Sequence, residues 1–302
     1  MQPWSSIERS KGYRRITVDP QNGAVGAEIS GVDLTKPIDE ELRGEILRAF
    51  AENLVIWFRD QKGFSRDNHL AFAQMFGQLQ KIPHILSVED YPDVQVVERL
   101  ADDTRRVVGE GYHNDSTFMT TPPTTVTMHA INVPDYGGDT AFANMYLAFE
   151  TLSEPMKAWL RTLNGVHSAE LIFGTGADQK RVMMKQMDPR EGDRQVVHPL
   201  VCVHPLSGRE YLFANIVYTR RIEGLSQAES RALLDFLCGH AISLAFTGRV
   251  RWKNGTVLIW DNRSCHHSAI ADYQGKYRYM ERVTTGGEVP VAARAHVKEL
   301  AA

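Results

Sequence analysis

His113 and Asp115 lie two positions apart and form the first group of side chains that could bind a metal ion. On an extended segment, residues i and i+2 point to the same face, so this imidazole and this carboxylate would converge on one point. The signal is weak when taken alone, because a chain with 11 histidines is expected to contain such a spacing by chance. A further ligand from elsewhere in the chain is needed to complete a metal site.

Two adjacent histidines, His266 and His267, form the second group. They come a short turn after the run Val257–Trp260, whose β-branched and aromatic residues predict a strand. Because neighbouring side chains on a strand point to opposite faces, only one of the two histidines can join a given site. A lone histidine at this place could equally be a buried structural residue.

Arg278 and Arg282 form the third group, on the run Tyr277–Thr284, which also predicts a strand. Because they are four positions apart, both side chains would point to the same side of a sheet. Arginine makes bidentate contacts with carboxylates, and an unpaired buried charge costs free energy. The two arginines therefore predict anionic partners, either a bound acid or an ordinary salt bridge to Asp or Glu.

The three groups together suit non-haem iron chemistry. Two histidines and one carboxylate on one face leave the other coordination positions open, as in Fe(II) oxygenases. A nearby arginine would anchor an acidic cosubstrate. A zinc hydrolase also uses two histidines and a carboxylate with a bound water, so the ligand types alone leave the metal open.

The elements that must position these residues are mostly short strands. Four helices are predicted from apolar residues at helical spacing, and they open at Asp39, Ser65, Ser153 and Ser226. Runs of β-branched and aromatic residues between turn signals predict strands at Leu54–Phe58, Val94–Val97, Thr125–His129, Val196–Val203, Tyr211–Ala214, Val257–Trp260 and Tyr277–Thr284. This order favours a mainly β sandwich or barrel core with flanking helices over a regular βαβ repeat.

Domain organisation follows from the lack of internal repeats and of any linker rich in Pro, Gly or Ser. We expect residues 1–302 to form a single domain. The segment 173–195 mixes glycines, basic residues and methionines without a clean period. A long segment of this kind is expected to be either a lid over the site or a solvated surface loop.

Composition argues against several classes of protein. The chain has 302 residues, 43% of them hydrophobic, a net charge of −3 and a pI near 6.4, which do not suit a nucleic-acid binder. No apolar run predicts a signal peptide or a membrane span. Three cysteines without a CxxC pair suit a reducing compartment, so we expect a cytoplasmic protein with no membrane or nucleic-acid partner.

Four motifs in this order resemble the taurine dioxygenase and 2,4-D dioxygenase family. They are GAEISGVDLTKP near the N-terminus, YHNDSTF, GGDTAFANMYLAFETL, and WDNRSCHHSAIADYQGKYRYMERVTTGG. The resemblance extends from about Ile16 to Pro290. It implies a double-stranded β-helix (jelly roll) core, the cofactors Fe(II), 2-oxoglutarate and O₂, and a homo-oligomer.

The resemblance also implies roles for single residues. His113, Asp115 and His267 match the iron ligands of the family, because the family's pattern is DNR, three residues and then histidine, which selects His267 rather than His266. Arg278 and Thr140 match the residues that hold 2-oxoglutarate.

Arg282 matches the arginine that holds the acidic group of the substrate, although the roles of the two arginines could be exchanged. His84 and Ser116 are further candidate substrate contacts. Ile82, rather than His84, occupies the ungapped position of the family's substrate-binding histidine.

Three further segments, VHPLVCVHPLSGRE, RIEGLSQAES and FTGRVRWK, look similar to enzymes that oxidise aryloxypropionate herbicides. The substrate expected on this basis is a small acid of the aryloxyalkanoate type, hydroxylated as 2-oxoglutarate is decarboxylated to succinate. The alternatives are the same chemistry on an alkyl sulfonate or sulfate such as taurine, a metal-dependent hydrolase, and a jelly-roll binding protein without activity.

Overall fold

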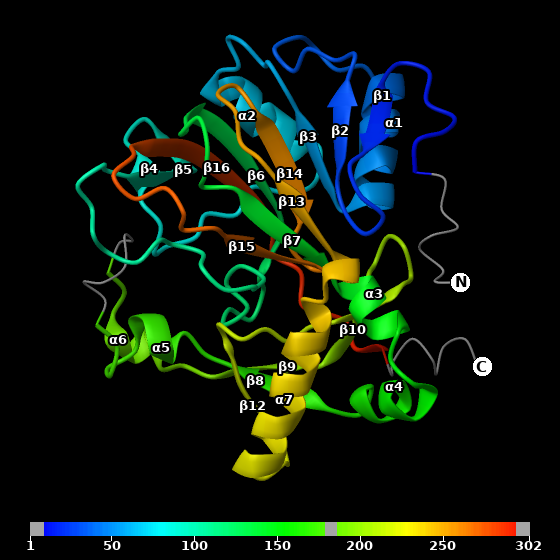
Figure 1. Ribbon diagram of the computed structural model, residues 1–302, viewed down its shortest axis with the longest axis vertical. Helices are drawn as coiled ribbons and strands as arrows, with labels where there is room; N and C mark the ends of the chain where they lie inside the picture. Colours follow the sequence, from blue (N-terminus) through cyan, green and yellow to red (C-terminus); the bar gives the residue numbers. More distant parts are fainter. Residues whose placement is uncertain (1–8, 179–185, 294–302) are drawn as a thin grey trace.

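Two β-sheets of unequal size form the core of the computed structural model, which describes residues 9–178 and 186–293 (Figure 1). The larger sheet has eight strands in the order β1-β2-β3-β14-β6-β16-β5-β4. Its strands are β1 (Thr17–Pro20), β2 (Ala27–Ser30), β3 (Val55–Phe58), β14 (Val257–Asp261), β6 (Pro123–Asn132), β16 (Arg278–Gly286), β5 (Tyr91–Arg99) and β4 (Ser87–Val88). All pairs are antiparallel except β2 with β3.

The smaller sheet contains three strands in the order β13-β7-β15, which are β13 (Thr247–Val250), β7 (Thr140–Asn144) and β15 (Cys265–Ala269). Buried side chains from both sheets belong to one hydrophobic cluster, including Val126 and Trp260 of the larger sheet and Phe142 and Cys265 of the smaller sheet. The two sheets therefore pack face to face as a jelly roll, and the expected mainly β fold class is confirmed.

Two helices cover the outer face of the larger sheet. They are α1 (Glu40–Asn53) and α2 (Arg66–Gln74), and both begin at side-chain caps. Asp39 accepts a hydrogen bond from the amide of Leu42, and Ser65 forms a capping box with Asn68. Apolar side chains of these helices pack with those of β3 and β14 in a second cluster.

Residues 145–178 and 186–246 lie mostly below the smaller sheet in Figure 1. They contain two small sheets, of order β12-β8-β9 and β10-β11. Their strands are β8 (Asn164–His167), β9 (Val196–Pro199), β10 (Val201–Val203), β11 (Glu210–Leu212) and β12 (Thr219–Ile222). The helices are α3 (Met145–Glu150), α4 (Glu154–Leu160), α5 (Glu170–Phe173), α6 (Pro189–Gly192), α7 (Gln227–Ala241) and a 3-10 turn at Leu244–Phe246.

The predicted helices all form, with shifted ends. The helix expected to open at Ser153 and to cover Met156 to Leu163 is α4, which ends at Leu160, and Ser153 makes no side-chain cap hydrogen bond. The predicted strand Val196–Val203 is two strands, because the chain leaves the β8 edge at Pro199 and pairs again with β11 from Val201.

The expected lid at 173–195 falls partly outside the described residues, which exclude 179–185. The helices α5 and α6, which lie before and after the excluded residues, contact each other, and Phe173 at the end of α5 is buried. Within the described chain, no helix has the length and apolarity required to cross a membrane.

Candidate active site

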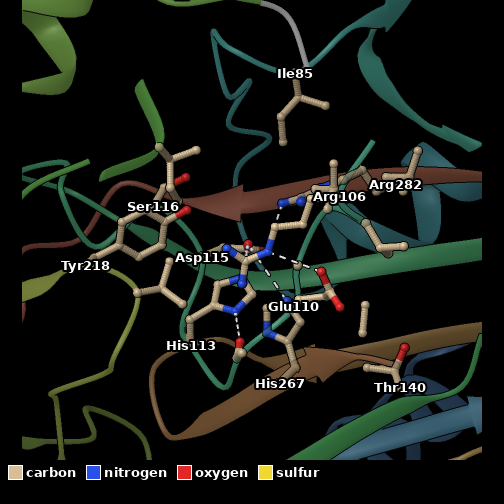
Figure 2. Close-up of a pocket in the computed structure, with 18 of the residues that line it drawn as sticks. Ile85, Arg106, Glu110, His113, Asp115, Ser116, Thr140, Tyr218, His267 and Arg282 are labelled. Atoms are coloured by element: carbon tan, nitrogen blue, oxygen red, sulfur yellow. Dashed lines mark hydrogen bonds and ion pairs between the residues drawn. The ribbon is translucent and has the colours of Figure 1, made fainter. Parts of the chain in front are cut away.

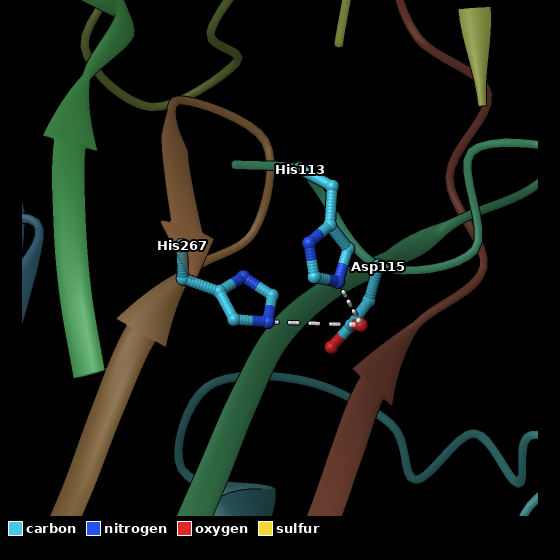
Figure 3. Close-up of side chains that lie close together, drawn as sticks. All are labelled: His113, Asp115 and His267. Carbon is cyan, nitrogen blue, oxygen red and sulfur yellow. Dashed lines mark ion pairs between the residues drawn. The ribbon is translucent and has the colours of Figure 1, made fainter. Parts of the chain in front are cut away.

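The two histidines and the aspartate expected to bind a metal lie together between the two sheets (Figure 3). One potential ligand atom from each of His113, Asp115 and His267 lies within 4.8 Å of the other two. Oδ1 of Asp115 is 3.5 Å from Nε2 of His113 and 3.8 Å from Nε2 of His267. All three residues are buried, as a metal centre shielded from bulk water requires.

Main-chain hydrogen bonds hold the two histidines in register. The amide of His113 donates to the carbonyl of His267 at 3.0 Å, and the amide of His267 donates back at 2.9 Å. This reciprocal pair fixes the segment before β6 against β15 although the two lie 154 positions apart in sequence. The expectation that only one of the adjacent histidines joins the site agrees with the geometry, because His266 lies outside the cluster.

Two asparagines attach the His-x-Asp segment to the turn after β14. The amide nitrogen Nδ2 of Asn114 donates to the carbonyl of Asn262 at 2.6 Å. Oδ1 of Asn262 accepts from the amide of Asp115 at 2.7 Å, and its Nδ2 donates to the carbonyl of Asp115 at 3.1 Å. Both asparagines are buried, so these bonds are shielded from water and orient the two ligands of this segment.

Protonation of the triad suits metal binding. Nδ1 of His113 is 2.7 Å from the carbonyl of Gly111, which makes Nδ1 the protonated nitrogen and leaves the lone pair of Nε2 toward Asp115. Burial lowers the pKa of His267 to about 3, so its imidazole is neutral. Burial alone would raise the pKa of Asp115, but Arg282 and the two histidines outweigh it and hold that pKa well below its usual range.

Arg282 contacts the metal triad directly. Its Nη2 donates to Oδ2 of Asp115 at 3.0 Å, so the two oxygens of this carboxylate face different partners. Both side chains are buried, and the charged pair is therefore little screened by solvent. The Nε of Arg282 is buried and has no hydrogen-bond partner among the described residues.

Arg278 lies four residues earlier on the same strand, and its surroundings differ. It is buried, and burial lowers its pKa. Its Nη2 reaches the carbonyl of Gly138 at 3.5 Å, while its Nε has no partner within the described chain. The nearby carboxylate of Asp139 pairs instead with Arg249 at 2.6 Å. Arg278 is thus a buried cation that makes no salt bridge to any described residue.

A pocket of about 260 Å³ joins these groups. Figure 2 shows Tyr218 and Ser116 on one side of the metal triad and Thr140 on the other. Every residue assigned to the site from the sequence lines this pocket: His84, His113, Asp115, Ser116, Thr140, His267, Arg278 and Arg282. Val97 also lines the pocket, whereas Phe118 does not. Further apolar lining comes from Ile85, Val107, Val108, Leu171, Ile172, Ile216 and Val217.

His84 lies on the Arg282 side of the pocket, packed against the rings of Phe118 and Phe173 at centroid distances of 5.4 and 5.0 Å. Burial, together with the charge of Arg282, lowers its pKa to about 4. The imidazole is therefore neutral near pH 7. Ile82, which occupies the ungapped position, is fully buried and does not line the pocket.

Sequence reasoning missed Tyr218. Its ring packs edge-on against His113 at a centroid distance of 6.0 Å and contacts Phe118 at 5.2 Å. Burial and the charge of Asp115 raise the pKa of its hydroxyl, which keeps it protonated. That hydroxyl has no hydrogen-bond partner among residues 9–178 and 186–293. The residue lies just before a short strand, and no motif marked it.

The donor set fits the cofactors that the sequence implied. Two imidazoles and a carboxylate suit Fe(II). The guanidinium of Arg278, which has no salt bridge to a described residue, lines the same pocket as the hydroxyl of Thr140, and together they suit a carboxylate.

Comparisons with known proteins agree with this chemistry. A family model described as taurine catabolism dioxygenase TauD, TfdA family, matches residues 17–284. An alpha-ketoglutarate-dependent sulfate ester dioxygenase of Pseudomonas putida is 33% identical over 291 residues, covering 91% of each chain. The 2,4-dichlorophenoxyacetate dioxygenase of Cupriavidus pinatubonensis is 30% identical and matches 89% of this chain and 97% of its own length.

A solved structure of a similar protein also matches this chain. It is that of a putative alpha-ketoglutarate-dependent taurine dioxygenase from Burkholderia xenovorans, with a TM-score of 0.79 and 32% identity. The match covers 92% of this chain and 95% of that chain.

Proposed function

Because the chain belongs to the TauD/TfdA family and is an iron- and 2-oxoglutarate-dependent dioxygenase, we propose that it oxidises a small organic sulfate ester or sulfonate. Hydroxylation of the carbon that bears the sulfate oxygen or the sulfonate sulfur gives an unstable product. That product separates into a carbonyl compound and inorganic sulfate or sulfite. The observation that carries the proposal is Arg282, a buried cation beside the metal triad on the pocket wall.

In this proposal His113, Asp115 and His267 hold the iron. Arg278 and Thr140 bind the distal carboxylate of 2-oxoglutarate. When bound, the iron, 2-oxoglutarate and O₂ supply the oxidising power, and 2-oxoglutarate leaves as succinate and CO₂. The protein holds the ligands in place, neutralises both acids and keeps water away from the reacting carbon.

The anionic group of the substrate would lie at the Arg282 end of the pocket. Arg282 neutralises the charge, while the imidazole of His84 and the hydroxyls of Ser116 and Tyr218 can donate hydrogen bonds to sulfate oxygens. The apolar side chains of Ile216 and neighbouring residues would contact the alkyl part. A sulfate group has more acceptor oxygens than a carboxylate, so it can use more of these donors.

An aryloxyalkanoate remains the second candidate, and it is supported by the similarity to the 2,4-dichlorophenoxyacetate enzyme. The same arginine could bind its carboxylate, and the apolar wall could accept an aromatic ring. The chain is 33% identical to the sulfate ester enzyme and 30% identical to the phenoxyacetate enzyme. This difference favours the alkyl sulfate or sulfonate, which is the alternative expected from the sequence, over the aryloxyalkanoate, which is the main expectation.

A substrate panel tests the proposal. Enzyme loaded with Fe(II) and 2-oxoglutarate is exposed to O₂ with alkyl sulfates, alkanesulfonates including taurine, and both enantiomers of an aryloxypropionate, while succinate and released sulfate, sulfite or phenol are measured. We expect sulfate or sulfite in equal amount to succinate. Release of phenol alone would support the second candidate. Release of sulfate without O₂ or 2-oxoglutarate would show a hydrolase and contradict both.

A further inference from the structure

Trp252 makes a hydrogen bond to the proposed cosubstrate-binding residue Thr140. Its indole Nε1 donates to Oγ1 of Thr140 at 3.0 Å, in a buried environment. Trp252 itself is buried and does not line the pocket, whereas Thr140 does. The pairing of β13 with β7 explains the contact, because Val250 pairs with Thr140 and Trp252 follows two residues later.

The direction of this hydrogen bond is fixed by chemistry. An indole nitrogen has a proton and no lone pair to accept with, so the oxygen of Thr140 is the acceptor. The hydroxyl proton of Thr140 must then be donated to another group. Among residues 9–178 and 186–293 that proton has no acceptor, and the pocket is the space beside it.

We infer that Trp252 is a positioning residue that orients the hydroxyl of Thr140 to donate into the pocket, toward the distal carboxylate of 2-oxoglutarate. This inference rests on the proposed function, in which Thr140 and Arg278 bind that carboxylate. Trp252 acts through Thr140, and the indole itself does not touch the cosubstrate.

The surroundings reinforce this orientation. Arg278 presents donors only, and the neighbouring carboxylates already have cationic partners: Asp139 and Asp272 pair with Arg249, and Glu110 pairs with Arg106. This end of the pocket thus offers a guanidinium and a hydroxyl proton. A carboxylate accepts hydrogen bonds and matches such an arrangement, whereas a hydroxyl free to rotate would spend part of its time with a lone pair facing the anion.

The test is a double-mutant cycle on the binding of 2-oxoglutarate. Calorimetric titration of the Fe(II)-loaded enzyme without O₂ gives the dissociation constant in the wild type, Trp252→Phe, Thr140→Val and the double variant. Phenylalanine keeps most of the ring and removes the N–H, so we expect binding about threefold to tenfold weaker. Thr140→Val should weaken binding at least as much. The double variant should have the same dissociation constant for 2-oxoglutarate as Thr140→Val, because Trp252 acts through Thr140.

Trp57→Phe is the matched control. Trp57 is also buried, and its indole donates to Glu28 at 2.9 Å. Its position is outside the pocket lining, so this variant should bind 2-oxoglutarate as the wild type does. If Trp57→Phe binds 2-oxoglutarate as weakly as Trp252→Phe does, the weakening comes from a general loss of packing, and the inference is overturned.

The other outcomes separate this inference from the proposed function. Wild-type binding in Trp252→Phe, or additive losses in the double variant, would overturn the role of Trp252 and leave the 2-oxoglutarate site intact. Wild-type binding in both Thr140→Val and Arg278→Met would contradict the proposed site itself. If Trp252→Phe does not fold, a benzothienyl analogue of tryptophan at position 252 replaces the N–H with sulfur at nearly the same shape, and the same weakening is expected.

Discussion

Two arginines on one strand, β16, have opposite surroundings. Arg282 already forms an ion pair with Asp115 at 3.0 Å, within the metal triad. Arg278, two strand repeats away on the same face and equally buried, makes no salt bridge to any described residue. Burial is costly for both charges, but only at Arg282 does the protein itself provide the compensating carboxylate.

From this difference we propose that the two ends of the pocket bind different acids. At Arg278 the missing anion must come from a ligand, so binding of a dicarboxylic cosubstrate relieves an unfavourable burial. At Arg282 an anionic substrate must share the guanidinium with Asp115, and so it is coupled electrostatically to the metal ligands. This comparison supports assigning 2-oxoglutarate to Arg278 and substrate to Arg282, rather than the exchanged roles.

The largest loss of activity is expected from a substitution in the metal triad. His267→Ala removes a proposed iron ligand and should reduce substrate-dependent succinate formation by more than about 100-fold, since loss of a partner outside the ligand shell already costs about 10- to 100-fold. Metal content measured after dialysis should fall in parallel. The control is His266→Gln at the adjacent position, which should retain its iron. Undiminished succinate formation in His267→Ala would disprove this ligand assignment.

Exchange of each arginine for methionine tests the comparison itself. Arg278→Met should weaken 2-oxoglutarate binding by about 30-fold or more, because truncating one partner of a buried charged pair costs about 2–5 kcal/mol. Arg282→Met should raise the substrate KM by a similar factor and leave 2-oxoglutarate binding within about twofold of the wild type. Calorimetry measures the dissociation constant of 2-oxoglutarate, and initial rates at saturating iron measure the substrate KM. The reverse pattern would show that the roles are exchanged.

The pH dependence of stability gives a smaller effect, centred on His84. Its pKa is lowered by burial to about 4 in the folded protein, against about 6.5 when exposed. Between these values the unfolded chain binds the extra proton, so the free energy of unfolding falls as pH drops through this window. The slope from this group is about 1.4 kcal/mol per pH unit. Urea unfolding at pH 7, 6 and 5 should show a shallower slope in His84→Gln than in the wild type.

The smallest effect is expected from the hydroxyl of Tyr218. Tyr218→Phe keeps the ring that packs on His113 and removes one proposed donor at the Arg282 end. A single hydrogen bond to the substrate accounts for about a twofold to tenfold rise in substrate KM. The 2-oxoglutarate dissociation constant should stay unchanged. An equal loss of both affinities would mean that the ring packing, and not the hydroxyl, had been disturbed.

The sequence predicted the site better than it predicted the strands that build it. The spacing of His113 with Asp115, and of Arg278 with Arg282, follows from the two-residue period of extended chain, and both pairs do face one pocket. Local pattern was sufficient because each pair lies on one segment. The meeting of these segments with His267 came from the family resemblance, since pairing across 154 positions leaves no local signal.

Other elements escaped prediction for physical reasons. The strand β7 carries Thr140, yet its sequence TAFAN has two alanines and no run of β-branched residues, and only its burial between β13 and β15 makes it a strand. Trp252 and Tyr218 gain their importance from contacts with residues distant in sequence. The lid expected at 173–195 stays a prediction.

The reciprocal amide–carbonyl pair between residues 113 and 267 has a consequence for handling the enzyme. These bonds involve no metal, so stripping the ion by chelation and dialysis should leave the imidazoles aligned and the fold intact. Little conformational entropy then opposes reconstitution, and activity should return on simple addition of ferrous salt without refolding.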